Sequence, residues 1–123
     1  MKLQRTQTAG QNTFTAYGED YVSVNAIRYS SNLIVLPDRL ITDWTQASFE
    51  TLSLADFELL AGLETEIILF GTGPQLRFPR PELMKPLIQA QKGLEAMDVH
   101  AACRTYNILL SEGRNVAAAL IFS

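Results

Sequence analysis

Strand-like runs alternate with helix-like segments along the second half of the chain, and this alternation limits the fold more than any other feature. The expected strands cover residues 67–70, 94–97 and 116–122. The first of them is a continuous apolar run, which is typical of a strand buried on both faces of a sheet. Strands that alternate with helices usually pair in parallel through right-handed crossovers. The second half therefore predicts an α/β fold.

Two helices have clear start and stop signals in the sequence. Ser53 followed by Asp56 has the spacing of a capping box, and Gly62 is the expected end of that helix. Asp98 is expected to cap a helix that runs to about residue 112, with Gly113 just beyond it. Both segments place apolar residues on one face, so both helices are expected to pack against the sheet.

A third helix is expected between these two, and prolines limit it. Pro81 suits the first position of a helix, because the missing N–H is not needed there. Pro86 lies inside the segment and should kink the helix or shorten its first turn. Gly93 is the expected end.

The first half of the chain is rich in β-formers and turn residues. Its expected strands are residues 14–17, 21–29, 33–36 and a short segment at 39–44. Pro37 and Asp38 form the expected turn between the last two. The N-terminal half is therefore predicted to be mainly β-structure.

Composition indicates an ordinary globular protein. The chain has 123 residues, of which 47% are hydrophobic and 19% charged, which fits one domain with one hydrophobic core. The net charge of −3 argues against nucleic-acid binding, because such proteins usually carry a basic excess. Residues 1–12 are expected to form a flexible arm. No apolar run approaches the roughly 20 residues that span a bilayer.

The segment at residues 71–80 is the first candidate for a binding site. It follows a buried strand, where α/β proteins usually place binding loops. Gly71 and Gly73 allow close backbone approach, and Arg77 with Arg80 can hold an anion. Leu76 stands where a dinucleotide fingerprint needs a third glycine, so nucleotide binding is disfavoured. The alternative is a tight turn with solvated arginines.

The last helix is the second candidate. Its apolar stripe is expected to face the core and contains Cys103, whose buried thiol is expected to be inert. His100, Arg104 and Asn107 lie on a flank beside that stripe, where Arg104 can hold an anion and Asn107 can donate and accept hydrogen bonds. A Cys103–His100 nucleophile pair is disfavoured by this geometry, and His100 is expected to be a solvated surface residue.

Neither a metal nor a cofactor is predicted. The chain has one histidine and one cysteine, which cannot make a histidine-rich site, a zinc cluster or an internal disulfide. Asp98 is best used as a helix cap, and Glu64 and Glu66 are expected to be solvated. A reducing compartment follows from the single cysteine.

Several ordered blocks over residues 66–120 resemble the family of mitochondrial complex I assembly factor 3 and its uncharacterised bacterial homologues. The blocks are IILFGTG at 67–73, RFP at 77–79, EL at 82–83, LEAMD at 94–98, AACRTYNIL at 101–109, EGR at 112–114 and VAAAL at 116–120. The resemblance covers about half the chain. It implies a three-layer α/β domain around a mixed central sheet, with a β-rich N-terminal portion.

The resemblance also bears on function. Eukaryotic members of the family act as assembly chaperones with a partner protein near the inner mitochondrial membrane, and no enzymatic activity is established for the class. This chain lacks a clear transit peptide, so it resembles a bacterial, cytoplasmic member. The leading hypothesis is a non-enzymatic interaction or assembly module with an unidentified protein partner.

Two alternatives stay open. The first is a small anionic-ligand-binding protein or enzyme with its site between the 71–80 loop and the helix that starts at Asp98. Its candidate ligand-binding residues are Gly71, Thr72, Gly73, Arg77, Arg104 and Asn107. The second is a homodimer in which the C-terminal strand pairs across a sheet edge.

Overall fold

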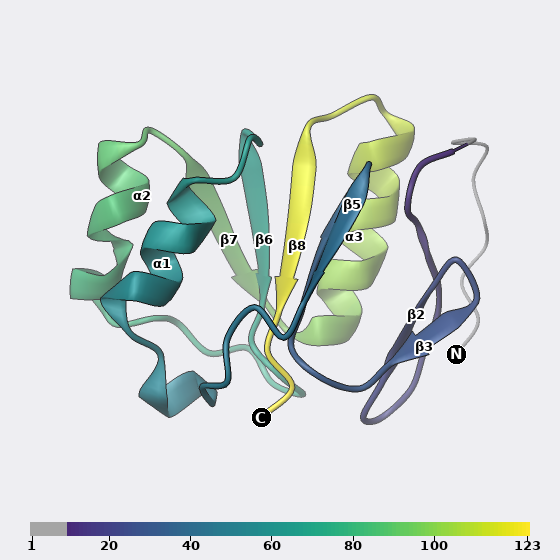
Figure 1. The fold of residues 1–123 in the computed structure, drawn as a ribbon, viewed down its shortest axis with the longest axis horizontal. Coiled ribbons are helices and arrows are strands. Elements are labelled where there is room, and N and C mark those ends of the chain that lie inside the picture. Colours follow the sequence, from purple (N-terminus) through teal and green to yellow (C-terminus); the bar gives the residue numbers. More distant parts are fainter. Residues whose placement is uncertain (1–9) are drawn as a thin grey trace.

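The computed structural model describes residues 10–123, which form two sheets and three α-helices (Figure 1). Most of the predicted flexible arm, residues 1–9, lies outside the described residues. Asn12, the last residue of that arm, donates hydrogen bonds to the carbonyl oxygens of Pro37 and Leu36, each at 2.9 Å. The chain is therefore anchored to the fold from this residue onward.

The central sheet has five strands in the order β5-β4-β8-β6-β7. The strands are β4 (Leu33–Leu36), β5 (Arg39–Thr42), β6 (Ile67–Gly71), β7 (Gly93–Met97) and β8 (Val116–Leu120). β6 pairs in parallel with β7 and β8, whereas β4 is antiparallel to β5 and β8. This confirms the mixed sheet. Two predicted boundaries are wrong, because β8 ends at Leu120 and Gly93 begins β7 rather than ending a helix.

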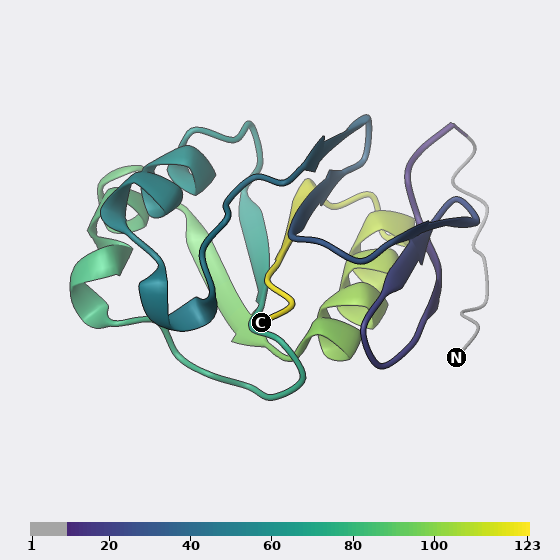
Figure 2. The same ribbon diagram turned by 60° about the horizontal axis from the view of Figure 1, so that its bottom comes forward.

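β8 lies in the middle of the sheet, and its side chains divide between two hydrophobic clusters. Val116, Ala118 and Leu120 belong to the cluster that contains α3 (Val99–Ser111). Ala117 and Ala119, together with Ile121 just after the strand, belong to the cluster that contains α1 (Leu54–Ala61) and α2 (Lys85–Gln89). Helices thus cover both faces of the sheet, as Figures 1 and 2 show, which confirms the three-layer α/β architecture.

The central position of β8 corrects one hypothesis from the sequence. A homodimer formed by pairing of the C-terminal strand requires that strand to lie at an edge. β8 instead has β4 on one side and β6 on the other. The edges of the central sheet are β5 and β7.

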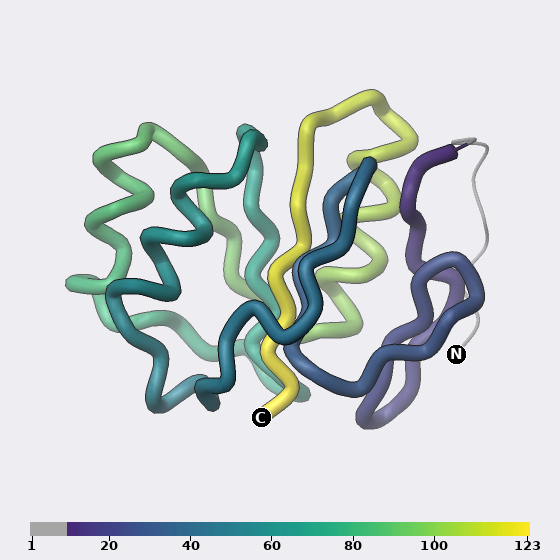
Figure 3. Tube along the Cα trace, in the orientation of Figure 1, coloured from purple at the N-terminus to yellow at the C-terminus, as the bar shows by residue number. Residues whose placement is uncertain are grey.

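The N-terminal portion forms a second sheet of three short antiparallel strands, β1 (Phe14–Tyr17), β2 (Val22–Val24) and β3 (Ile27–Tyr29). The predicted single strand at 21–29 is wrong, because the chain reverses at Asn25 and Ala26. Both residues have positive φ, 50° and 69°, as tight two-residue hairpins require. The small sheet lies beside α3 (Figure 3), and Phe14 joins its hydrophobic cluster.

The predicted helix caps are confirmed where the capping group and its hydrogen-bond partner are close in sequence. The Asp56 carboxylate accepts a hydrogen bond from Ser53 N at 2.9 Å, and the Asp98 carboxylate accepts one from Ala101 N at 2.9 Å. The segment after Pro81 begins as a 3₁₀ turn, η2 (Pro81–Met84), and continues as α2. Pro86 therefore stands in the first turn of α2 instead of inside a longer helix, and α2 ends at Gln89 rather than near Gly93.

Candidate functional site

The loop after β6 runs over residues 72–80 and passes close to the start of α3. Gly71, at the end of β6, has no room for a side chain. A Cβ there would lie 2.7 Å from Leu120 Cδ2 and 3.3 Å from Val99 Cα. Gly73 adopts φ +98°, a conformation that other residues rarely take. The two glycines therefore serve close packing and chain reversal at this end of the sheet.

Thr72 is fully buried and organises the loop from inside. Its hydroxyl donates to the Gln75 carbonyl at 2.7 Å and accepts from Arg77 N at 2.9 Å. Its own N–H donates to the carbonyl of Met97 at the end of β7. These bonds fix the loop between the ends of β6 and β7.

Arg77 holds the loop from outside. Its guanidinium donates to the Thr72 carbonyl at 2.6 and 3.0 Å, to Glu50 Oε1 at 3.0 Å and to the Ser123 carbonyl at 3.3 Å. The same group lies 4.4 Å from the centre of the Phe49 ring. The predicted anion-binding arginine is thus engaged with its own loop, with η1 (Phe49–Thr51) and with the C-terminal segment.

The outer part of the loop exposes apolar side chains. Phe78 is 74% exposed and Leu76 is 49% exposed. Both flank Arg77, whose contacts fix the backbone between them. Sequence reasoning missed Phe78 as a functional residue. The available signal was a large aromatic residue next to Pro79 in a segment without strand or helix periodicity.

A hollow of about 330 Å³ adjoins this loop and is called here the apolar hollow. It is lined by residues of η1, the loop and η2, namely Phe49, Glu50, Leu52, Arg77, Pro79, Arg80 and Leu83. Leu52 and Leu83 are buried, whereas Arg80 is largely exposed. Arg80 donates to the Leu52 carbonyl at 3.1 Å. The volume of the apolar hollow lies within the range of ligand-sized pockets.

The flank of α3 binds the N-terminal sheet. Asn107 is buried, and its side-chain amide accepts from Phe14 N at 3.0 Å and donates to Phe14 O at 2.8 Å. Arg104 donates to the Tyr17 hydroxyl at 2.9 Å. The predicted ligand residues Arg77, Arg104 and Asn107 therefore contact three different groups. Ligand binding by the predicted set stays a prediction.

His100 is half-buried, so the expectation of a solvated histidine is wrong. Its ring stacks on Tyr17 with centroids 4.0 Å apart, and Nε2 lies 2.6 Å from the Gly18 carbonyl oxygen. A second hollow of about 110 Å³ brings His100 and Gly73 together, with Asp98 and Phe122 also in its lining. The loop and the start of α3 thus lie side by side around a space too small for most ligands, and a site between them stays a prediction.

Cys103 lies in the core, as the helical stripe predicted. Burial raises the pKa of its thiol far above the ordinary value, so the nucleophilic thiolate is disfavoured. Within residues 10–123, no group of three or more histidine, cysteine or carboxylate side chains could hold a metal ion. The same part of the chain has no helix long and apolar enough to cross a bilayer.

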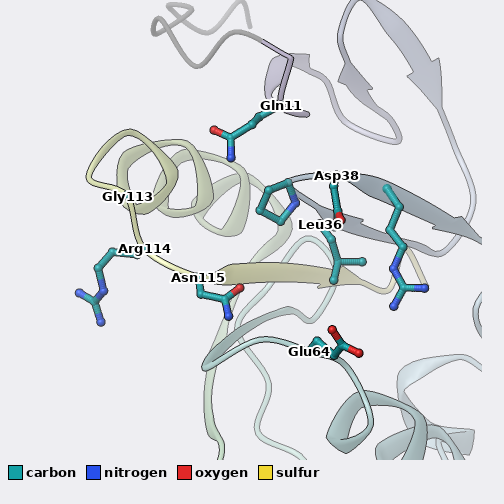
Figure 4. A pocket seen from close by; sticks show the side chains of 9 residues that line it. Gln11, Leu36, Asp38, Glu64, Gly113, Arg114 and Asn115 are labelled. Atoms are coloured by element: carbon teal, nitrogen blue, oxygen red, sulfur yellow. The ribbon is translucent and has the colours of Figure 1, made fainter.

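A larger and polar hollow of about 650 Å³ lies at the opposite end of the parallel strands (Figure 4). Its lining includes Asp38, Glu64 and Arg114, so it carries charges of both signs. Figure 4 shows the Arg114 side chain pointing away from Asp38 and Glu64. These charged residues are largely exposed, which is typical of a solvated surface rather than a closed site.

Comparison with known proteins places the chain in a family. Residues 14–121 match the model of a family described as protein of unknown function (DUF498/DUF598). The chain belongs to this family. A Francisella tularensis relative named 13 kDa major membrane protein is 27% identical over 98% of this chain and 99% of its own length. Bovine NADH dehydrogenase [ubiquinone] 1 alpha subcomplex assembly factor 3 is 32% identical over 80% of this chain.

The chain spans 54% of the length of that bovine relative. Some solved structures match over nearly their whole length. The crystal structure of a Bordetella parapertussis protein has a TM-score of 0.86 and 38% identity, covering 94% of this chain and 99% of that one. A Bordetella pertussis protein described as an Mth938-like domain has a TM-score of 0.79 and 32% identity, covering 98% and 92%. The predicted family resemblance is thereby confirmed.

Proposed function

We propose that this chain is a non-enzymatic protein-binding module of the assembly-factor type, and that the loop at residues 74–80 carries its binding surface. The observation that supports this most is the exposure of Leu76 and Phe78 on a loop held by Arg77. Exposed apolar residues on a fixed loop bind a partner at a low entropic cost, because little ordering is left to do. Large aromatic side chains also contribute strongly at interfaces.

Two further observations support binding rather than catalysis. Cys103, the candidate nucleophile, is buried with a raised pKa. Arg77 and Asn107, the candidate ligand-binding side chains, are engaged in internal hydrogen bonds. A ligand would have to displace these hydrogen bonds, and this is unfavourable because it would leave buried polar groups without partners.

The names of the animal relatives support the assembly role. Those proteins are named as assembly factors of NADH dehydrogenase, and this chain aligns with about half their length. We extend the role to this chain as part of the proposal, with subunits of a comparable respiratory enzyme as candidate partners. A cytoplasmic location in a bacterium stays a prediction, and one relative is named a membrane protein.

The proposal is tested by affinity capture with the full chain as bait in lysate of the cells that express it. Bound proteins are identified for the wild type and for Phe78→Ser, with Ile108→Ser as the matched control. Ile108 is 57% exposed on α3, so its replacement removes a comparable apolar side chain elsewhere. A partner retained by the wild type and Ile108→Ser but lost by Phe78→Ser is expected. Equal capture by all three would reject the loop as the binding surface.

The anionic-ligand alternative has a separate test. It requires Arg104, whose observed contact is the hydrogen bond to Tyr17. Thermal shifts are measured with inorganic phosphate, citrate and nucleotides on the wild type and on Arg104→Ala. Stabilisation of the wild type that is lost in the variant would support this alternative over protein binding alone. No shift in either would remove it.

A further inference from the structure

The floor of the apolar hollow is made of core side chains. Leu52 is 2% exposed and Leu83 is 6% exposed, and both belong to the hydrophobic cluster on the α1–α2 face of the sheet. Phe49 forms a wall and stacks on Phe70 with centroids 6.4 Å apart. A large apolar side chain placed in this hollow would therefore extend the existing core outward. Its burial would be favourable because it removes apolar surface from water on both sides.

The walls of the hollow are held before any partner binds. Arg77 fixes one side through Thr72 and Glu50, with its side chain only 28% exposed. Arg80 is tied to the Leu52 carbonyl on the other side. Pro79 and Pro81 have fixed φ angles, and Pro81 also restricts the backbone of Arg80 before it. Such a preformed site spends little binding free energy on ordering.

The side chains that line the hollow carry a net positive charge. The lining contains two guanidinium groups and one carboxylate, and Glu50 is already paired with Arg77. Arg80 is 61% exposed and lies 3.8 Å from Glu82, which is itself 67% exposed. An ion pair this exposed and this long contributes little. The Arg80 guanidinium is thus available for a better-placed carboxylate.

We propose that the apolar hollow binds an extended segment of a partner protein in which a large apolar side chain stands next to acidic residues. The apolar side chain lies on Leu52 and Leu83, and a carboxylate pairs with Arg80. Phe78 and Leu76 do not line the hollow but are exposed on the same loop, and they extend the surface that the segment would cover. This inference rests on the proposed function and specifies the chemistry of the partner. A segment with basic residues at the same place is disfavoured, because Arg80 lines the hollow whereas Glu82 does not.

The test uses the full chain labelled with ¹⁵N and three blocked peptides of equal length. The first has the core Leu-Phe-Asp-Glu between Gly-Ser flanks, the second Leu-Phe-Lys-Lys, and the third Ser-Ser-Asp-Glu. Amide shifts are followed during titration. The first peptide is expected to shift the amides of Phe49, Leu52 and Leu83 and to bind at least tenfold more tightly than either of the others. Equal binding of the acidic and basic peptides would overturn the proposal, as would the absence of shifts at millimolar peptide.

Charge is then tested on the protein side. Arg80→Gln is expected to weaken binding of the acidic peptide about threefold or more. Lys85→Gln is the control, because Lys85 is exposed on the neighbouring α2 but does not line the hollow. An equal effect of both variants would contradict a specific contact with Arg80.

Affinity capture separates the two proposals. A partner that depends on Phe78, with no acidic peptide bound at the hollow, would retain the protein-binding function and reject only this partner chemistry.

Discussion

At the scale of single residues, Arg77 fixes the conformation of the loop that carries the candidate surface. Its guanidinium joins the backbone of the loop to Glu50 of η1 and to the carbonyl of Ser123. The side chain is only partly exposed, and its two hydrogen bonds to the Thr72 carbonyl are shielded from water, whereas those to Glu50 and Ser123 are exposed. Loss of the group leaves the Thr72 carbonyl and the Glu50 carboxylate without this donor.

Arg77→Gln is therefore expected to lower the free energy of unfolding by about 1–3 kcal/mol, the usual cost of leaving shielded acceptors unsatisfied. Urea denaturation followed by circular dichroism measures it. Arg80→Gln is the matched control and should change stability by no more than about 0.5 kcal/mol, because its side chain is mostly solvated. The interpretation that Arg77 holds the loop in place would be wrong if the free energy of unfolding fell by the same amount in both variants.

Residue roles could be predicted from the sequence only where the partner is near in the chain. The caps at Ser53 and Asp98 depend on groups three residues away, and both were identified. Asn107 and Phe14 are 93 positions apart, and Arg77 and Glu50 are 27 apart. A helical wheel can show that Asn107 lies beside the core stripe. The wheel cannot show which backbone groups will form hydrogen bonds with the Asn107 side-chain amide.

At the scale of elements, the N-terminal sheet is attached to α3 mainly through β1 and the residues next to it. Asn107 satisfies both backbone groups of Phe14, and Tyr106 donates from its hydroxyl to the Asn12 carbonyl. Arg104 and His100 add polar contacts to Tyr17 and Gly18, and the Phe14 ring packs against the Tyr106 ring with centroids 5.2 Å apart. The small sheet should therefore open more easily than the central one.

Asn107→Ala should loosen this attachment selectively, because it leaves the N–H and C=O of Phe14 without partners. Hydrogen exchange is expected to speed up in residues 14–29, while the amides of β6 stay protected. Thr105→Ala, a half-buried position on the same helix, serves as the control and should leave both regions unchanged. Uniform acceleration across both sheets in Asn107→Ala would contradict separate docking of the N-terminal sheet.

The hairpin between β2 and β3 gives a second prediction at this scale. Ala26 has φ 69°, which is costly for a residue with a Cβ. Ala26→Gly is expected to raise the free energy of unfolding by about 0.5–1 kcal/mol. Ala55→Gly, an exposed position inside α1, should lower it by about 1 kcal/mol. A loss of stability in Ala26→Gly, measured by urea denaturation, would show that the turn conformation is not strained.

The same hairpin explains why one predicted strand was wrong. Residues 21–29 are rich in β-formers throughout, and Asn25-Ala26 lacks the glycine that usually marks a two-residue turn. The central strands were easier to predict. The apolar run of β6 and the small apolar residues of β8 need two covered faces, and only a sheet between helix layers provides them.

At the scale of the whole molecule, two ionisable groups in the core on the α3 side link stability to alkaline pH. Burial raises the pKa of Cys103, and burial followed by the charge of Asp38 raises the pKa of Tyr106. Both pKa values are higher in the folded than in the unfolded state. The stability they contribute is therefore complete below the unfolded values and is lost as the pH rises above them.

The free energy of unfolding is accordingly expected to be steady near neutral pH and to fall as the pH rises through the ordinary thiol value of 9.0 and tyrosine value of 10.0. Urea denaturation at a series of pH values from 7 to 11 measures the fall. Cys103→Ala should make the decline smaller between these two values, whatever its effect at neutral pH. An unchanged pH profile in the variant would contradict a linkage through the buried thiol.

The central claim for the molecule is that the loop at residues 74–80 binds a protein partner. The most direct measurement is calorimetric titration of the captured partner into the wild type, Phe78→Ser and Ile108→Ser, each first shown to be folded. We predict at least a tenfold loss of affinity for Phe78→Ser and wild-type affinity for Ile108→Ser. Unchanged affinity in Phe78→Ser, with loss in Ile108→Ser, would move the binding surface to α3 and contradict the claim.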